Sequence, residues 1–329
     1  MQKDHARDVA APGSASPLPA AYDVVVIGAG PAGLTMATYL GRFRRRVLVL
    51  DGGPSRASWI PESHNTPGFP HGVGGDALLA RLREQAHLAG AEIRTGVATL
   101  ISQSTDGFRI SIDAPGGDDE VMFGQFVVMA TGVVDRKPDL PGIDAGIRRG
   151  LVRVCPICDA YEAIDQRIAV LGDGDLGARE AQFLRTYSDA VTLLQTDGPL
   201  KASSEAALAA AGIEVISAGI DDLHIDETIR LTSSTDERRF DCLYLALGCE
   251  MQSRLAVRCG AEHDAENNLI VDANQQTSIQ GLYAVGDVVR GLNQIAVATG
   301  EAAIAAANIH KRLREKERSF AQPVSAPAS

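Results

Sequence analysis

The sequence predicts an α/β fold of two three-layer domains built around parallel sheets, with the second domain inserted in the first. Two stretches of the chain repeat one pattern, in which an apolar run, a glycine-rich turn, a helical segment and a second apolar run follow one another. Each stretch is closed further along the chain by an apolar run that ends in glycine. The 329 residues include 33 glycines and 5 % aromatics, a composition that suits an α/β protein with tight backbone turns.

The first stretch begins at residues 23–27, where Asp23 precedes four aliphatic residues that are typical of a buried parallel strand. A G-x-G-x-x-G motif follows, then a helical segment to about Arg44 and a second strand over residues 47–50, directly before Asp51. The motif contains Gly28, Gly30, Pro31, Ala32 and Gly33. A strand before the motif, a helix after it and an acid beyond the second strand are the context of a Rossmann-like dinucleotide-binding fold.

The motif residues have the properties that a bound dinucleotide requires. Gly28 permits the tight turn, Gly30 lets the backbone approach a pyrophosphate, and Gly33 lets the helix pack closely on the strand. The helix N-terminus offers free N–H groups and a positive dipole to the phosphates. Asp51 can accept hydrogen bonds from ribose hydroxyls.

The second stretch repeats this arrangement. A strand over residues 168–171 leads into a helical segment that runs to about Tyr187, and a strand over residues 191–194 precedes Asp197. The glycines of this motif are Gly172, Gly174 and Gly177. Two nucleotide folds imply two nucleotides, and the natural pair is FAD with NADH or NADPH, because one supplies hydride to the other.

Apolar runs that end in glycine indicate where each domain closes. The first covers residues 126–132 and ends in Ala130, Thr131 and Gly132, and the second covers residues 243–248. A later run that ends in Gly286 and Asp287 indicates a return to the first domain. We therefore expect an FAD-binding domain at residues 21–136 and 249–318, an NAD(P)-binding domain at 137–248, and disordered tails at 1–20 and 319–329.

Two of the five cysteines form a Cys-x-x-Cys motif, with Cys155 and Cys158 followed by Asp159. A structural zinc site normally needs four ligands, and no histidine pair or second cysteine pair supplies them, so we expect no metal. Dithiol–disulfide exchange suits the motif better, because a helix N-terminus favours the reactive thiolate. We expect the remaining cysteines to be small buried residues: Cys242, Cys249 and Cys259.

Bulk properties exclude several classes of function. The formal net charge of −11 argues against nucleic acid or an anionic membrane as the main partner. No apolar run approaches the roughly 18 residues of a membrane span. The first 20 residues lack the apolar region of a secretory signal, and an odd cysteine count fits a reducing compartment, so we expect a cytoplasmic protein.

Taken in order, these motifs resemble the low-molecular-weight thioredoxin reductase family over residues 23–313. The matching segments are residues 28–33, 65–70, 130–132, 155–159, 172–177, 286–287 and 293–296, and an alanine-rich final helix. The resemblance implies that Asp287 binds the ribityl–phosphate region of FAD and that Asn65 belongs to the same site. It places Asn293, Gln294 and Ile295 at the isoalloxazine ring, where the N-terminus of the final helix would stabilise a reduced, anionic flavin.

The resemblance also assigns roles to the redox motif. It implies that Cys158 exchanges electrons with the flavin, that Cys155 attacks an external disulfide, and that Asp159 carries the proton. The expected substrate is a thioredoxin-like protein, and the expected assembly is a homodimer.

The chain departs from the family pattern at the second nucleotide fold. In the family, arginines after the second strand bind the 2′-phosphate of NADPH, whereas residues 194–198 hold none and include Asp197. Asp197 would repel a 2′-phosphate but could accept from a 2′-hydroxyl, so we expect that NADPH is not preferred. Asp173 and Asp175 also flank the expected pyrophosphate, so either they point outward or nucleotide affinity is poor. A degenerate fold kept for its packing is also compatible with these residues.

The sequence leaves the electron acceptor open. The residues between the cysteines, Pro156 and Ile157, resemble those of related flavoproteins that include dithiol oxidases passing electrons to oxygen. A flavin-bound redox sensor is a third possibility. Arg148, Arg149 and Arg153 precede the motif, and they are either ordinary surface or a patch that steers an acidic protein substrate.

Overall fold

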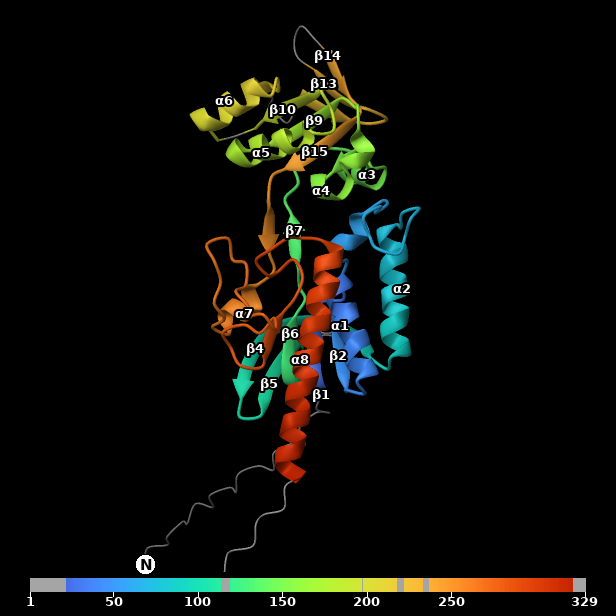
Figure 1. Ribbon diagram of the computed structural model, residues 1–329, viewed down its shortest axis with the longest axis vertical. Helices are drawn as coiled ribbons and strands as arrows, with labels where there is room; N and C mark the ends of the chain where they lie inside the picture. The colour runs from blue at the N-terminus through green and yellow to red at the C-terminus, as the bar shows by residue number, and fades with distance from the viewer. Residues whose placement is uncertain (1–21, 114–118, 197, 218–221, 233–236, 322–329) are drawn as a thin grey trace, which may run out of the picture.

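A computed structural model gives the structure of residues 22–113, 119–196, 198–217, 222–232 and 237–321, which are the residues described below. The chain forms two domains, one above the other in Figure 1, and a pair of strands connects them. These strands are β7 (Val133–Asp135) and β16 (Cys249–Met251), which pair antiparallel with Cys249 opposite Asp135. The segment expected as an inserted domain, residues 137–248, therefore lies between β7, where the chain leaves the first domain, and β16, where it returns.

The first domain is built on a seven-stranded sheet with the order β3-β2-β1-β6-β5-β4, and β17 pairs with β6. Its strands are β1 (Tyr22–Ile27), β2 (Val47–Asp51), β3 (Glu92–Thr95), β4 (Val97–Ser104), β5 (Gly107–Asp113), β6 (Asp119–Met129) and β17 (Leu282–Ala284). β1 is parallel to β2 and β6, whereas β4, β5 and β6 form an antiparallel meander. The valines of β1 are fully buried, as expected for a central strand covered on both faces.

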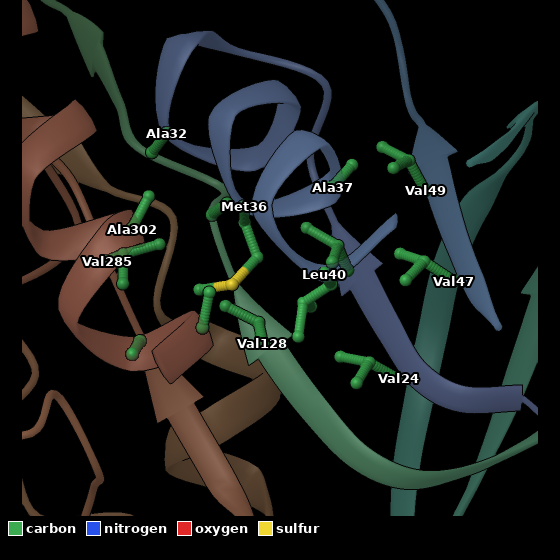
Figure 2. Packing of buried hydrophobic residues seen from close by; sticks show 14 of the residues in the cluster. Val24, Ala32, Met36, Ala37, Leu40, Val47, Val49, Val128, Val285 and Ala302 are labelled. Carbon is green, nitrogen blue, oxygen red and sulfur yellow. The ribbon is translucent and has the colours of Figure 1, made fainter. Parts of the chain in front are cut away.

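Helices cover one face of this sheet. They are α1 (Pro31–Arg42), α2 (Gly75–Leu88) and α8 (Ile295–Ala321), while the short helices η1 (Arg56–Trp59) and α7 (Arg254–Arg258) lie in the connections. Figure 2 shows Met36 of α1 between Val128 of β6 and Val285. Small residues such as Ala302 line the buried face of α8 and let α1 approach it closely. α8 ends at Ala321 and so extends into the segment 319–329 that we expected as a tail.

The second domain contains a five-stranded parallel sheet with the order β11-β10-β9-β15-β8. Its strands are β8 (Val152–Arg153), β9 (Ile168–Gly172), β10 (Val191–Gln195), β11 (Glu214–Ser217) and β15 (Cys242–Ala246). Beside it lies a small antiparallel sheet of β12 (Leu223–Ile225), β13 (Ile229–Thr232) and β14 (Glu237–Phe240). The helices are α3 (Ile143–Arg148), α4 (Pro156–Asp159), η2 (Tyr161–Ala163), α5 (Gly174–Leu184) and α6 (Ala202–Ala210).

Two glycines of the first motif are required by close backbone contacts. A Cβ atom at Gly28 would lie 2.2 Å from the carbonyl oxygen of Ala130, and the φ of Gly28 is +113°. A Cβ atom at Gly33 would lie 1.9 Å from the carbonyl oxygen of Gly28. The turn and the close helix–strand packing predicted from the motif are therefore present.

We predict that Gly33→Ala destabilises the protein by about 2 kcal/mol, because the added methyl group has to displace backbone. Gly300→Ala is the matched control, since a Cβ atom there meets nothing within 4 Å in helix α8. The control should be neutral or stabilising by up to about 1 kcal/mol. Chemical denaturation of both variants checks this expectation, and equal stability would contradict it.

Candidate active site

A cavity of about 970 Å³ lies where the two domains meet, a size within the range of cofactor sites. It brings together the first glycine motif, the ends of β6 and β17, the start of α8 and the Cys-x-x-Cys motif of the second domain. The predicted site residues that line it are Gly28, Gly30, Pro31, Ala32, Asn65, Ala130, Thr131, Gly132, Cys155, Cys158, Asp159, Gly286, Asp287, Asn293, Gln294 and Ile295.

The remaining predicted residues have different surroundings. Gly33 and Asp51 are not among the described residues that line this cavity. The Asp51 carboxylate instead accepts a hydrogen bond from Arg83 Nη2 at 2.6 Å. A ribose contact of Asp51 stays a prediction. Gly172, Gly174 and Gly177 lie at the β9–α5 turn of the second domain, and Asp197 lies outside the described residues.

The N-terminus of α1 is suited to an anion. Its cap is Gly30, its first residue is Pro31, and in the described structure it has no side-chain cap and no acidic residue in its first turn. Unsatisfied N–H groups and the positive end of the dipole therefore face the cavity. These features fit the pyrophosphate of FAD.

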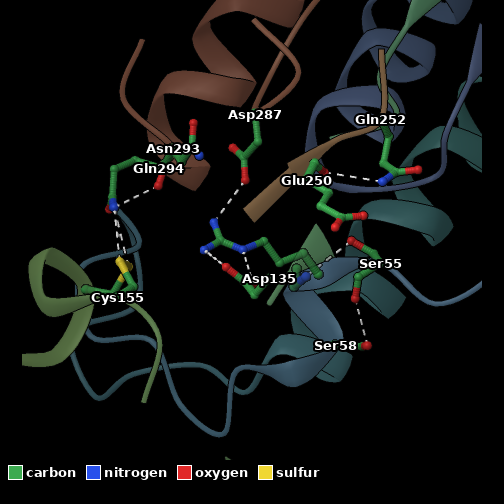
Figure 3. Close-up of polar contacts among 12 residues, drawn as sticks. Ser55, Ser58, Asp135, Cys155, Glu250, Gln252, Asp287, Asn293 and Gln294 are labelled. Carbon is green, nitrogen blue, oxygen red and sulfur yellow. Dashed lines mark hydrogen bonds and ion pairs between the residues drawn. A yellow bond between two sulfur atoms is a disulfide. The ribbon is translucent and has the colours of Figure 1, made fainter. Parts of the chain in front are cut away.

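Arg56, which the sequence analysis missed, joins two carboxylates at the cavity wall. Its Nε and Nη2 atoms each donate to Asp135 at 2.7 Å, and Nη1 donates to Asp287 at 3.1 Å. Asp135 and Asp287 are labelled in Figure 3, and dashed lines mark the hydrogen bonds that each of them accepts. Burial works to lower the pKa of Arg56, but the two carboxylates outweigh it and raise that pKa, so the side chain is a fixed cation. Burial raises the pKa of Asp287, and Arg56 opposes that rise.

Gln294 connects the first domain to the disulfide. Its Oε1 atom accepts from Asn65 Nδ2 at 2.9 Å, and its Nε2 atom lies 3.3 Å from Cys158 Sγ and 3.5 Å from Cys155 Sγ (Figure 3). Because α8 begins at the next residue, its N-terminus lies at the same end of the cavity. The resemblance placed Asn65 and Gln294 at the cofactor, which stays a prediction, and their contacts with each other and with the disulfide are findings of the structure.

Cys155 and Cys158 form a disulfide, and Cys155 is the cap residue of the short helix α4. Cys242, Cys249 and Cys259 are free thiols. Cys242 is buried in β15, where burial raises its pKa to about 12, while Cys249 and Cys259 are partly buried. The expectation of a buried small residue therefore fits Cys242 best.

Asp159 is held by two residues that the sequence analysis did not connect with it. Tyr244 Oη donates to Asp159 Oδ1 at 2.8 Å, and Arg153 Nη1 donates to the Asp159 carbonyl oxygen at 2.6 Å and to Tyr244 Oη at 3.2 Å. Burial raises the pKa of Asp159 to about 6, and the nearby Arg153 and Tyr244 limit that rise. The available signal was a tyrosine in an aliphatic strand, since a buried hydroxyl needs a partner.

Arg153 is therefore not an ordinary surface residue, whereas a positive patch that steers an acidic substrate stays a prediction. The side chain is partly buried and donates to backbone and side-chain groups of its own domain. Arg148 and Arg149 are exposed, and Arg149 donates to the carbonyl oxygens of Ala145 and Asp226.

The second glycine motif differs electrostatically from the first. Asp173 is the exposed cap residue of α5, and Asp175 lies in its first turn. Asp175 accepts from Lys201 Nζ at 2.5 Å and from Ser204 Oγ at 2.8 Å, and the hydrogen bond from Lys201 lowers its pKa to about 2. Asp175 is thus paired with the start of α6, and Lys201 is engaged there as well.

Comparisons with known proteins agree with this arrangement. A family model described as pyridine nucleotide-disulphide oxidoreductase matches residues 22–302. A thioredoxin reductase of Streptomyces coelicolor is 30 % identical over 282 residues, which cover 81 % of this chain and 86 % of that protein. A thioredoxin reductase structure from Giardia duodenalis superposes with a TM-score of 0.77 at 25 % identity, covering 89 % of this chain and 99 % of that one. A crystal structure of HlmI superposes with a TM-score of 0.80 at 29 % identity, covering 92 % and 95 %.

We predict that Arg56→Met destabilises the protein by about 3 kcal/mol at neutral pH, because two carboxylates then face each other without a cation. Without Arg56 the pKa of Asp287 should rise further. When the pKa of a carboxyl group is higher in the folded than in the unfolded protein, the free energy of unfolding depends on pH. The contribution of the group is fully present below its unfolded pKa of about 3.9, and it is lost as the pH rises through the folded pKa. The loss should therefore shrink towards pH 4.

Arg83→Met is the matched control, because the Arg83–Asp51 pair is more exposed and should contribute at most about 1 kcal/mol. Denaturation curves of both variants at several pH values provide the measurement. A loss for Arg56→Met that is small, or that does not change with pH, would show that the cluster is not held in this way.

Proposed function

Because the chain belongs to the pyridine nucleotide-disulphide oxidoreductase family, we propose that it is an FAD-dependent disulfide reductase of the thioredoxin reductase kind. Electrons from NAD(P)H pass through the flavin and the Cys155–Cys158 disulfide to a disulfide of a thioredoxin-like protein. The observation that carries the proposal is the position of that disulfide in the wall of the same cavity as the first glycine motif.

FAD fits the residues of this cavity. The α1 N-terminus with Gly28 and Gly30 would take the pyrophosphate, Asp287 the ribityl region, and Asn293, Gln294 and Ile295 the ring. Bound there, FAD supplies a two-electron carrier between a hydride donor and a disulfide. Arg56 adds a partly buried cation beside Asp287, which offsets negative charge in this part of the wall.

The chain's own residues then perform the thiol chemistry. Two electrons and two protons convert the disulfide into a dithiol. Cys155 as thiolate attacks the external disulfide, and Cys158 attacks the resulting mixed disulfide, which reforms the Cys155–Cys158 bond and releases the substrate dithiol. Asp159 carries the proton, since a carboxyl group with a pKa of about 6 can both accept and return one near neutral pH.

The relatives that bear the name thioredoxin reductase favour this function over the dithiol oxidase and the redox sensor. The nicotinamide nucleotide is assigned to the β9–α5 turn with Gly172, Gly174 and Gly177, and to Asp197 at the ribose. Lys201 is paired with Asp175, which supports the view that it does not serve a 2′-phosphate.

We also propose a homodimer, as the resemblance implies, and a cytoplasmic location, as the cysteine usage suggests. No helix in the described ranges is long and apolar enough to cross a membrane. Exposed apolar side chains on the neighbouring helices α1, α2 and α8, namely Tyr39, Leu88 and Ile304, support a contact between copies. Sedimentation equilibrium tests this, and a monomeric mass would exclude it.

We predict that the purified protein is yellow and that both active-site cysteines are needed for turnover. Cys155→Ser should leave the flavin reducible by its donor but abolish reduction of a thioredoxin disulfide, and Cys158→Ser should also uncouple the flavin from the dithiol. Cys259→Ser is the matched control and should keep turnover near that of the native enzyme. A colourless protein that takes up no FAD, or turnover in both active-site variants, would exclude the mechanism.

We predict that NADH reduces the flavin at least as fast as NADPH in anaerobic stopped-flow experiments. A 2′-phosphate normally needs one or more arginines, and residues 194–198 provide none. Asp197→Asn should shift the preference towards NADPH, whereas Asp189→Asn, on an exposed turn of the same domain, should not. A preference of the native enzyme for NADPH of about tenfold or more would mean that another cation binds the phosphate.

A further inference from the structure

Asp159 is the end of a hydrogen-bonded series that begins at Arg153. Arg153 of β8 and Tyr244 of β15 are register partners on adjacent parallel strands, so the sheet brings their side chains to the same place. Tyr244 is fully buried and its hydroxyl group lies between the guanidinium and the carboxylate. Arg153 also donates to the Gly150 and Asp159 carbonyl oxygens, which fixes its position against the segments on both sides of the cysteines.

The direction of these hydrogen bonds follows from the chemistry of the groups. A guanidinium group has donors and no acceptor, so the Tyr244 oxygen accepts from Arg153 and its own proton is left for Asp159. Burial raises the pKa of the Tyr244 hydroxyl, and that group therefore stays protonated wherever the enzyme works. Tyr244 is thus a permanent donor to the Asp159 carboxylate, polarised by the cation behind it.

Other groups around Asp159 either raise its pKa or are uncharged near neutral pH. Glu162 of η2 raises the pKa of Asp159 by charge repulsion, and burial raises it most. Cys242 of β15 is a neutral thiol near neutral pH, because burial raises its pKa to about 12. Arg153 and Tyr244 are the groups that favour the carboxylate.

We propose that Tyr244 and Arg153 are positioning residues that orient the Asp159 carboxyl group and stabilise its proton-accepting form beside the Cys155–Cys158 pair. This role rests on the proposed function, since it concerns proton transfer in the same thiol chemistry. The Cys155 thiol gives its proton to Asp159, and the thiolate attacks the external disulfide. The first leaving thiolate takes that proton from Asp159. Cys158 then loses its own proton and attacks Cys155 Sγ of the mixed disulfide, which reforms the Cys155–Cys158 bond, and the second substrate sulfur leaves and takes up the Cys158 proton.

Tyr244→Phe tests the proposal in enzyme reduced anaerobically with dithionite and mixed with an aromatic disulfide that releases a coloured thiolate. In the native enzyme the exchange rate should fall as pH drops through about 6, where Asp159 becomes protonated. Loss of the Tyr244 hydroxyl should raise the pKa of Asp159. The acidic limb of the pH–rate profile, where the rate falls, should therefore move to higher pH by about one unit. At pH 6 the rate should then be lower by about fivefold.

Tyr283→Phe is the matched control. Tyr283 is equally buried in β17 and donates to Asn308 at 2.6 Å, so the substitution removes a comparable hydroxyl in the other domain. Its pH profile should coincide with that of the native enzyme. If Tyr244→Phe does not fold, Arg153→Lys tests the same contact, because lysine keeps the positive charge but lacks the several N–H donors of the guanidinium group. The acidic limb of the pH–rate profile should then move in the same direction by a smaller amount.

An unmoved limb in Tyr244→Phe or in a folded Arg153→Lys, or an equal shift in Tyr283→Phe, would overturn the proposal. Dithionite supplies the electrons, so the test does not depend on the nicotinamide. Native enzyme that exchanges after dithionite reduction but accepts no electrons from NADH or NADPH would refute the proposed function and leave this test intact. A reduced native enzyme that does not exchange at all would overturn both.

Discussion

The antiparallel pairing of β7 with β16 is the constraint on which the position of the site depends. The chain leaves the first domain and returns to it through these two strands, with Asp135 opposite Cys249. The short helix η1 of the first domain contacts both the connecting strands and the second domain. Arg56 of η1 donates to Asp135 of β7, and Trp59 of η1 packs against the core of the second domain. Lys137, just past the crossing, lies 3.7 Å from the Trp59 ring centre. These contacts set the second domain so that its disulfide meets the cavity of the first.

The two nucleotide folds share a topology and differ in charge. At α1 the helix begins with Gly30 and Pro31, and its first turn is free of acid in the described structure. At α5 the corresponding positions include Asp173 and Asp175, and the second of these is neutralised by Lys201 from α6. Because a helix N-terminus attracts anions through its dipole and free N–H groups, carboxylates there weaken the attraction. A common fold therefore does not give the two turns the same affinity for a phosphate.

The sequence predicted the two-domain α/β architecture, and the close contacts at Gly28 and Gly33 follow the roles inferred from the motif. The resemblance implied that Asn65 and Gln294 belong to the cofactor site, whereas the contact of Asn65 with Gln294 and of Gln294 with the cysteines appears only in the structure. Spacing along the chain could not reveal partners that come from distant strands or loops. Asp51 pairs with Arg83 from α2, Arg56 joins Asp135 to Asp287, and Tyr244 of β15 donates to Asp159 of α4. Each of these pairings depends on tertiary packing, so no local pattern names the partner, even where a tyrosine in an aliphatic strand indicates that one is needed.

Two partly buried carboxyl groups in one cavity, Asp159 and Asp287, show how hydrogen-bond partners determine the role of a carboxyl group. Burial raises the pKa of both Asp159 and Asp287. Asp287 meets a guanidinium directly, an arrangement that favours the charged form and suits a fixed ligand for a polar group. Asp159 instead meets a neutral hydroxyl, with the cation one hydrogen bond further away, and its pKa stays at about 6. The charge of Arg153 and, after it, the hydrogen bond from Tyr244 lower the pKa that burial raises. The balance leaves a group that can both take a proton and return it near neutral pH.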